Sequence, residues 1–155
     1  MARQNRSSAP RRAGVSPQTD ELASTLLGRA LDCLAVGEPL EVLLAVQDAA
    51  GTIAPYEFGG DGPEECLAAA RRRVGELAQR SGDPAAGLAA PVRYAIAYEG
   101  AVADDDGTYL DAVLLEFGER GYEAFSAYSL VDGKGDEDAF RWTDPAPAGQ
   151  MEPLL

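Results

Sequence analysis

The chain has 155 residues, of which 46% are hydrophobic, and its 13 basic and 26 acidic side chains give a net charge of −13. A chain of this length is expected to form about one domain with its own core, and no apolar stretch reaches the roughly 18 residues that a membrane span needs. The acidic balance argues against a nucleic-acid partner, because nucleic acids are bound largely by Lys and Arg that displace counterions.

The sequence contains no histidine. This absence excludes Ser-His-Asp and Cys-His catalytic arrangements and metal sites that use imidazole ligands. Cys33 and Cys66 lie within helical patterns, which indicates buried thiols of a cytoplasmic protein rather than a disulfide. We therefore expect a cytoplasmic, non-enzymatic protein with no catalytic residues, no cofactor and no bound metal.

The first helix is predicted to begin at Ser16 and Pro17, where a capping hydroxyl precedes a proline in the first turn. Before it, residues 1–15 combine Ser and Pro with four arginines and are predicted to form a disordered basic segment. These arginines precede the first acid, so residues 17–155 contain 9 basic and 26 acidic side chains, a net charge of −17. The folded body is therefore expected to be more acidic than the whole chain.

Both predicted helices show apolar residues at helical spacing, and the first is expected to end at Gly37. The second follows the glycine-rich residues 58–63 and runs to about Arg80. This loop matches neither phosphate-binding glycine pattern, and its acids would repel a phosphate. We expect it to be only the start of a helix.

Residues 40–48 are apolar on both faces of a predicted strand, which places them inside a sheet. Residues 52–58 are predicted to return beside them, and Pro55 favours an edge position there. A short last strand is expected within residues 138–143, followed by an extended, proline-containing tail over residues 144–155. Three longer antiparallel strands are predicted at residues 92–99, 109–117 and 122–131.

This order of elements predicts an α+β fold in which two helices accompany a mainly antiparallel sheet of about five strands, in one domain over residues 16–143. In element order the chain resembles roadblock and profilin-like domains. That resemblance implies a five-stranded sheet used for dimerisation, ligand sensing or partner docking. If both helices covered the same face, the other face would expose too much apolar surface for a soluble monomer. We therefore expect either helices on opposite faces or a homodimer.

Two acidic segments lie between predicted strands. Neither fits a calcium-binding loop, because a count from Asp104 places Leu115 at the twelfth position and a count from Asp132 places Thr143 there, where an acid is required. We expect these segments to direct the protein to a basic or neutral protein partner, as an adaptor, inhibitor or immunity-type protein. The acidic candidates for partner binding are Asp104, Asp105, Asp106, Asp132, Asp136, Glu137 and Asp138.

Tyr94, Tyr98 and Tyr128 are further candidates for partner binding, and they also support an alternative function. In that alternative they line the pocket of a small-ligand sensor. A third possibility is a carboxylate-dependent hydrolase, which requires two acids about 5–9.5 Å apart in a concave site. The apolar C-terminal residues Leu154 and Leu155 are expected either to dock on the body or to serve as a short peptide motif.

Overall fold

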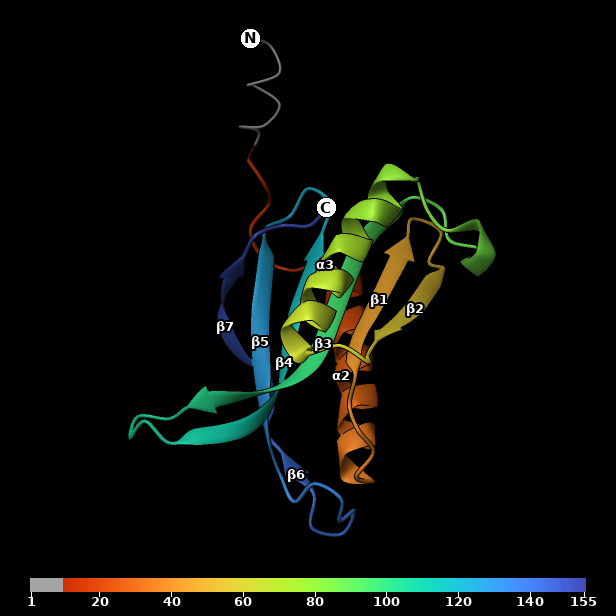
Figure 1. Cartoon of the computed structure of the whole chain (residues 1–155). Coiled ribbons are helices and arrows are strands. Elements are labelled where there is room, and N and C mark those ends of the chain that lie inside the picture. Colours follow the sequence, from red (N-terminus) through yellow and green to blue (C-terminus); the bar gives the residue numbers. More distant parts are fainter. Residues whose placement is uncertain (1–9) are drawn as a thin grey trace.

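A computed structural model describes residues 10–155 and contains two α-helices and an antiparallel sheet (Figure 1). The α+β prediction is confirmed, although the sheet has seven strands rather than about five. Within residues 10–155, no helix is long and apolar enough to cross a membrane. In chain order the elements are α2 (Pro17–Ala35), β1 (Val42–Asp48), β2 (Ile53–Phe58), α3 (Pro63–Gln79), the 3-10 turn η1 (Pro84–Ala86), β3 (Pro91–Ala103), β4 (Tyr109–Glu119), β5 (Ala124–Asp132), β6 (Arg141–Trp142) and β7 (Ala146–Met151).

The strands follow the order β2-β1-β3-β4-β5, and β6 and β7 pair with different parts of β5. β1 has a neighbour on both sides, as its two apolar faces predict, and so does β4. β2, which contains Pro55, lies at the edge of the sheet. The apolar pattern and the proline therefore gave the correct positions of these strands.

The two helices cover opposite faces of the sheet (Figure 1). Leucines of α2 pack against small side chains such as Ala95 and Ala97, while Val74 and Leu77 of α3 pack against Ile96 and its neighbours. Full burial of one such aliphatic side chain contributes about 1.5–3 kcal/mol. This arrangement is the first of the two that we expected, and it covers both faces of the sheet without a second copy.

The segment before α2 is ordered where the structure describes it. The backbone N–H of Arg12 donates to the carbonyl of Gly121 at 2.8 Å, and the N–H of Glu123 donates to the carbonyl of Arg12 at 2.9 Å. These bonds join the segment to the turn between β4 and β5. Of the segment 1–15 that the sequence predicts to be disordered, residues 1–9 lie outside the described residues.

The predicted tail contributes a strand. β7 pairs with β5 from Ala124 to Tyr128, and the paired residues of β7 include Pro147 and Gly149. A proline is tolerated at a sheet edge because its missing N–H is not needed on the open side. Beyond β7, Leu154 and Leu155 pack against the apolar cluster beneath α3, so the C-terminal residues dock on the body.

Candidate functional site: the acidic end of the sheet

The hairpin formed by β3 and β4 is longer than the sheet around it. β1 pairs with β3 only as far as Ala97, and β5 pairs with β4 only from Ala112 onward. Beyond these points the two strands continue to pair with each other as far as Ala103 and Tyr109. Residues 99–111, called the arm below, therefore project from the body as a two-stranded ribbon (Figure 1).

The tip of the arm is a tight acidic turn. The carboxylate of Asp104 accepts hydrogen bonds from the backbone N–H groups of Asp106 and Thr108, each at 2.9 Å, and Gly107 adopts a φ of 80°. This φ is one that glycine adopts without strain, so Asp106 and Gly107 form a tight hairpin turn of the kind that Asp-Gly favours. Asp105 and Asp106 are exposed at the end of the arm.

The second acidic segment, residues 133–140 between β5 and β6, lies beside the base of the arm. The Lys134 ammonium is 2.5 Å from the carboxylate of Glu99 and 3.7 Å from that of Asp111. The hydrogen bond to Glu99 raises the pKa of Lys134, which keeps this side chain charged. Gly135 donates its N–H to the carbonyl of Leu34 at 3.0 Å, which ties the same loop to the end of α2.

The structure thus brings the two predicted acidic segments together. We use the term acidic end for the arm together with residues 132–142, which comprise the last residue of β5, the loop after it and β6. Within it, Lys134 and Arg141 are the basic side chains. Its nine carboxylates are Glu99, Asp104, Asp105, Asp106, Asp111, Asp132, Asp136, Glu137 and Asp138.

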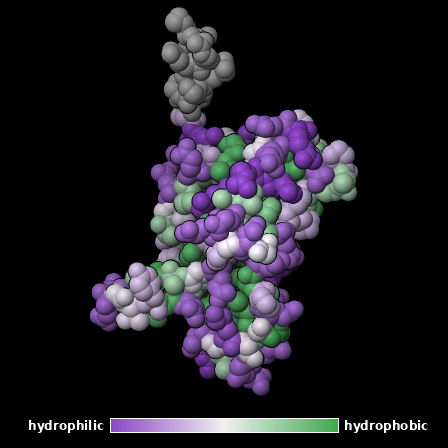
Figure 2. Space-filling model, in the orientation of Figure 1, coloured by the Kyte–Doolittle hydropathy of each residue, from purple (hydrophilic) through white to green (hydrophobic). Residues whose placement is uncertain are grey.

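A groove of about 650 Å³ lies between the arm and β6, and it is lined by apolar side chains together with Asp111, Asp132 and Arg141. Tyr109 and Leu110 line it from the arm and Trp142 from β6, with exposed fractions of 74%, 38% and 57%. The Trp142 ring stacks on that of Phe140 with 5.9 Å between ring centroids, which holds the indole in place. Figure 2 shows a hydrophilic arm tip and apolar surface where the arm leaves the body. Exposed aromatic side chains rimmed by polar residues are typical of protein interaction sites. We call this feature the aromatic groove.

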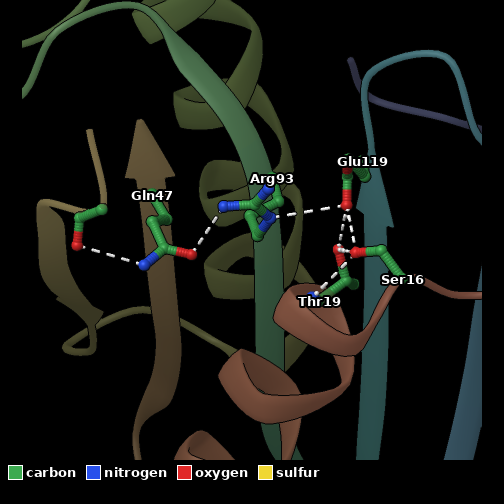
Figure 3. Close-up of polar contacts among 6 residues, drawn as sticks. Ser16, Thr19, Gln47, Arg93 and Glu119 are labelled. Atoms are coloured by element: carbon green, nitrogen blue, oxygen red, sulfur yellow. Dashed lines mark hydrogen bonds and ion pairs between the residues drawn. The ribbon is translucent and has the colours of Figure 1, made fainter. Parts of the chain in front are cut away.

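At the opposite end of the same hairpin, charged and polar side chains are bonded to one another (Figure 3). Arg93 Nε lies 3.4 Å from Glu119 Oε1, and Arg93 Nη1 donates to Gln47 at 2.8 Å. The hydroxyls of Ser16 and Thr19 donate to Glu119 at 2.5 and 2.7 Å. Burial acts to raise the pKa of Glu119, but these donors outweigh it and hold that pKa below its usual value. This network fixes the start of α2 on the sheet.

The candidate tyrosines lie on the face of the sheet that α3 covers, away from the tip of the arm. Tyr94 is 1% exposed, and burial raises its pKa to about 12. The Tyr98 hydroxyl donates to Glu116 at 2.9 Å, and Tyr128 is half-buried on β5. Because Tyr94 offers almost no surface to a ligand, a pocket lined by these three tyrosines is not supported.

Glu116 is a deeply buried carboxylate on that face, with 4% of its side chain exposed. Arg71 of α3 forms a two-pronged ion pair with it, with Arg71 Nε donating at 3.0 Å. Tyr98 supplies a further donor. All three side chains are engaged in joining α3 to β3 and β4, so the cluster has a structural role.

Sequence reasoning identified the acids of this end but missed the aromatic groove. The sequence of residues 109–117 is apolar on both faces and predicts a central strand, but Tyr109 and Leu110 at its start are exposed. Their exposure depends on where β5 leaves β4, and no local signal in the sequence marks that point.

Comparison with known proteins adds no further information. No family model, curated protein or solved structure matches this chain. The similarity to roadblock and profilin-like domains is thus one of element order only, and the functional argument depends on the geometry described above.

Proposed function

We propose that the protein is a non-enzymatic interaction module that binds a basic protein partner through its acidic end. The observation that carries this proposal is the concentration of nine carboxylates around an exposed aromatic groove, with only Lys134 and Arg141 as basic side chains there. At the other end of the hairpin the principal charges, Arg93 and Glu119, already satisfy each other.

The two features of the acidic end would serve different steps of binding. Unpaired carboxylates on a projecting arm attract a basic surface over several ångströms and raise the association rate. Tyr109 and Trp142 then supply the apolar contact area that slows dissociation, since aromatic anchors dominate binding energy at protein interfaces. Charge thus acts mainly on the encounter and the groove mainly on the lifetime of the complex.

The position of the acids favours this function over a hydrolase. Asp104, Asp105 and Asp106 lie at the tip of a projecting hairpin, whereas acid catalysis on a glycoside needs two carboxyl groups facing each other across a concave site. A reducing compartment is part of the proposal, because both Cys33 and Cys66 are free thiols; we therefore place the protein in the cytoplasm.

The test compares two baits in capture from a cell extract at low salt. One bait is the wild-type protein, and the other carries Asp105→Asn, Asp106→Asn, Tyr109→Ala and Trp142→Ala. A partner retained by the first bait and lost from the second is purified, and its association rate is measured at low and high ionic strength. We expect the rate to fall at least about tenfold as salt rises, because exposed charges are screened beyond a Debye length of about 8 Å at physiological salt.

A partner that binds both baits equally would contradict the proposal, as would an association rate that ignores ionic strength. Circular dichroism and thermal melting of the second bait provide the control for folding. The substituted side chains are exposed, so the melting temperature is expected to change little.

A further inference from the structure

The arm leaves one strand edge open. Asp104 donates its N–H to the carbonyl of Thr108, and at the other end of the hairpin Arg120 donates its N–H to the carbonyl of Val92. The backbone groups of the even-numbered residues of β3 therefore point toward β4. Backbone groups alternate in direction along an antiparallel strand. The odd-numbered residues 99, 101 and 103 therefore direct their N–H and C=O groups to the side where β1 would lie, and the β1 ladder ends at Ala97.

This open edge contains no proline or lysine, and Glu99 is its one charged residue. Sheet edges are normally blunted by proline, lysine, a bulge or a covering segment, because unpaired backbone groups invite another strand. The outer strands β2 and β7 contain Pro55 and Pro147. By contrast, residues 100–103 read Gly-Ala-Val-Ala, and their small side chains leave the backbone accessible.

We infer that an extended segment of the basic partner adds as a strand to the β3 edge of the arm, over residues 99–103. This inference rests on the function proposed above and specifies how the partner binds. Backbone hydrogen bonds to three outward-facing residues supply the register, as in other cases of strand addition. Asp104, Asp105 and Asp106 lie just beyond the end of this edge, where they meet basic side chains of the added strand.

Charge favours such a partner over a second copy of this chain. Paired strands lie about 4.8 Å apart, well within the Debye length of about 8 Å. If two arms paired edge to edge, the acids of one copy, Glu99 and the aspartates of its tip, would lie close to the acids of the other copy. A basic strand replaces this repulsion with attraction, so we assign the edge to the partner and treat self-pairing as an outcome of the test.

The test uses a matched pair of variants at Ala101, whose backbone groups face outward. Ala101→Pro removes the outward N–H without breaking the bonds between β3 and β4, whereas Ala101→Val keeps this N–H and adds side-chain bulk. The probes are two short synthetic peptides of equal charge, one alternating lysine with valine and the other lysine with glycine. Only the first has a strong preference for an extended strand.

Binding is followed by fluorescence anisotropy of the labelled peptides at low salt. We expect the lysine–valine peptide to bind wild type and Ala101→Val about tenfold more tightly than the lysine–glycine peptide does, which corresponds to about 1.4 kcal/mol. Ala101→Pro should remove this preference and leave the weaker, charge-driven binding that both peptides share.

The outcomes separate the two proposals. Equal binding of both peptides, unaffected by Ala101→Pro, would overturn strand addition while keeping recognition by charge. Binding of neither peptide would overturn recognition of basic segments itself. A dimer of the wild type that Ala101→Pro abolishes in sedimentation experiments would also overturn the inference, because the edge would then belong to a second copy.

Discussion

The two ends of the β3–β4 hairpin use charge in opposite ways. At one end, Arg93 and Glu119 are bonded to each other, Arg93 also donates to the amide oxygen of Gln47, and Glu119 accepts from hydroxyls that hold α2 on the sheet. At the other end, Asp105 and Asp106 are exposed on a ribbon with few neighbours. One end of the β3–β4 hairpin therefore belongs to a structural network, and the other end is an exposed surface. Where charges are buried and paired, a substitution should affect stability, and where they are exposed it should affect association.

The largest expected effect is on stability, at the buried ion pair beneath α3. The side chain of Glu116 is 4% exposed. Arg71→Met removes its ion-pair partner and leaves Tyr98 as its remaining hydrogen-bond donor. Breaking a buried pair by removing one partner typically costs about 3–5 kcal/mol of unfolding free energy, and we expect the lower end of this range because the Arg71 side chain is 39% exposed. Urea denaturation measures this loss. Arg72→Met, at an exposed neighbouring position, is the control and should change stability by less than about 0.5 kcal/mol.

The next effect is the loss of the network at the start of α2. Glu119→Ala removes the acceptor of bonds from Ser16, Thr19 and Arg93, and we expect it to cost about 2–3 kcal/mol. Glu123→Ala, in the same turn region, keeps those contacts and serves as the control. If both variants unfold at the same urea concentration, the network is not structural.

The pH dependence of this effect has a definite sign. The folded-state pKa of Glu119 lies below the usual 4.5, so its stabilisation is fully present above that pH and is lost as pH falls through the folded-state pKa. The difference in stability between wild type and Glu119→Ala should therefore shrink on acidification below pH 4.5. Urea melts at a series of pH values measure it, and a difference that grows in acid would contradict the assignment.

Substitutions in the aromatic groove should change binding and leave stability almost unaltered. Tyr109 is 74% exposed, so Tyr109→Ala should change the unfolding free energy by less than about 0.5 kcal/mol. Its loss as an interface anchor should speed dissociation of the partner about 5- to 30-fold, equivalent to about 1–2 kcal/mol. Ile53→Ala, on the distant edge strand β2, is the matched control and should not affect dissociation.

The smallest expected effect concerns the tip of the arm. Asp105→Asn together with Asp106→Asn should lower the association rate a few-fold at low salt and leave the dissociation rate unchanged, because exposed charges act on the encounter. Stopped-flow measurements at low and high salt would show this difference disappearing as charges are screened. A difference that persists at high salt would indicate a direct contact instead.

Much of the fold was predictable from local patterns. The hydroxyl of Ser16 accepts the N–H of Thr19 at the predicted helix start, and Pro55 marks an edge strand as expected. β7 was missed because its proline and glycine residues give no alternating apolar pattern, and backbone pairing with β5 supplies its structure. The arm was predicted too short for a similar reason, since Gly100 and Ala101 have no core to face.

The candidate site was predictable only in part. The sequence shows two acidic segments between predicted strands, one beginning at Asp104 and the other at Asp132, and the composition alone indicates an acidic surface. The exposure of Tyr109 and Trp142 depends on where β1 and β5 stop pairing, which long-range packing decides. The same packing buries Tyr94, which the sequence could not distinguish from a surface tyrosine.

The central claim is that the acidic end is the binding surface, and an NMR titration tests it most directly. The ¹⁵N-labelled protein is titrated with the lysine–valine peptide, and the shifts of its backbone amides are followed at low and high salt. We predict shifts confined to residues 99–111 and 131–143 that weaken as salt rises. Shifts centred on Arg93 and Glu119, or no shifts at low salt, would contradict the account.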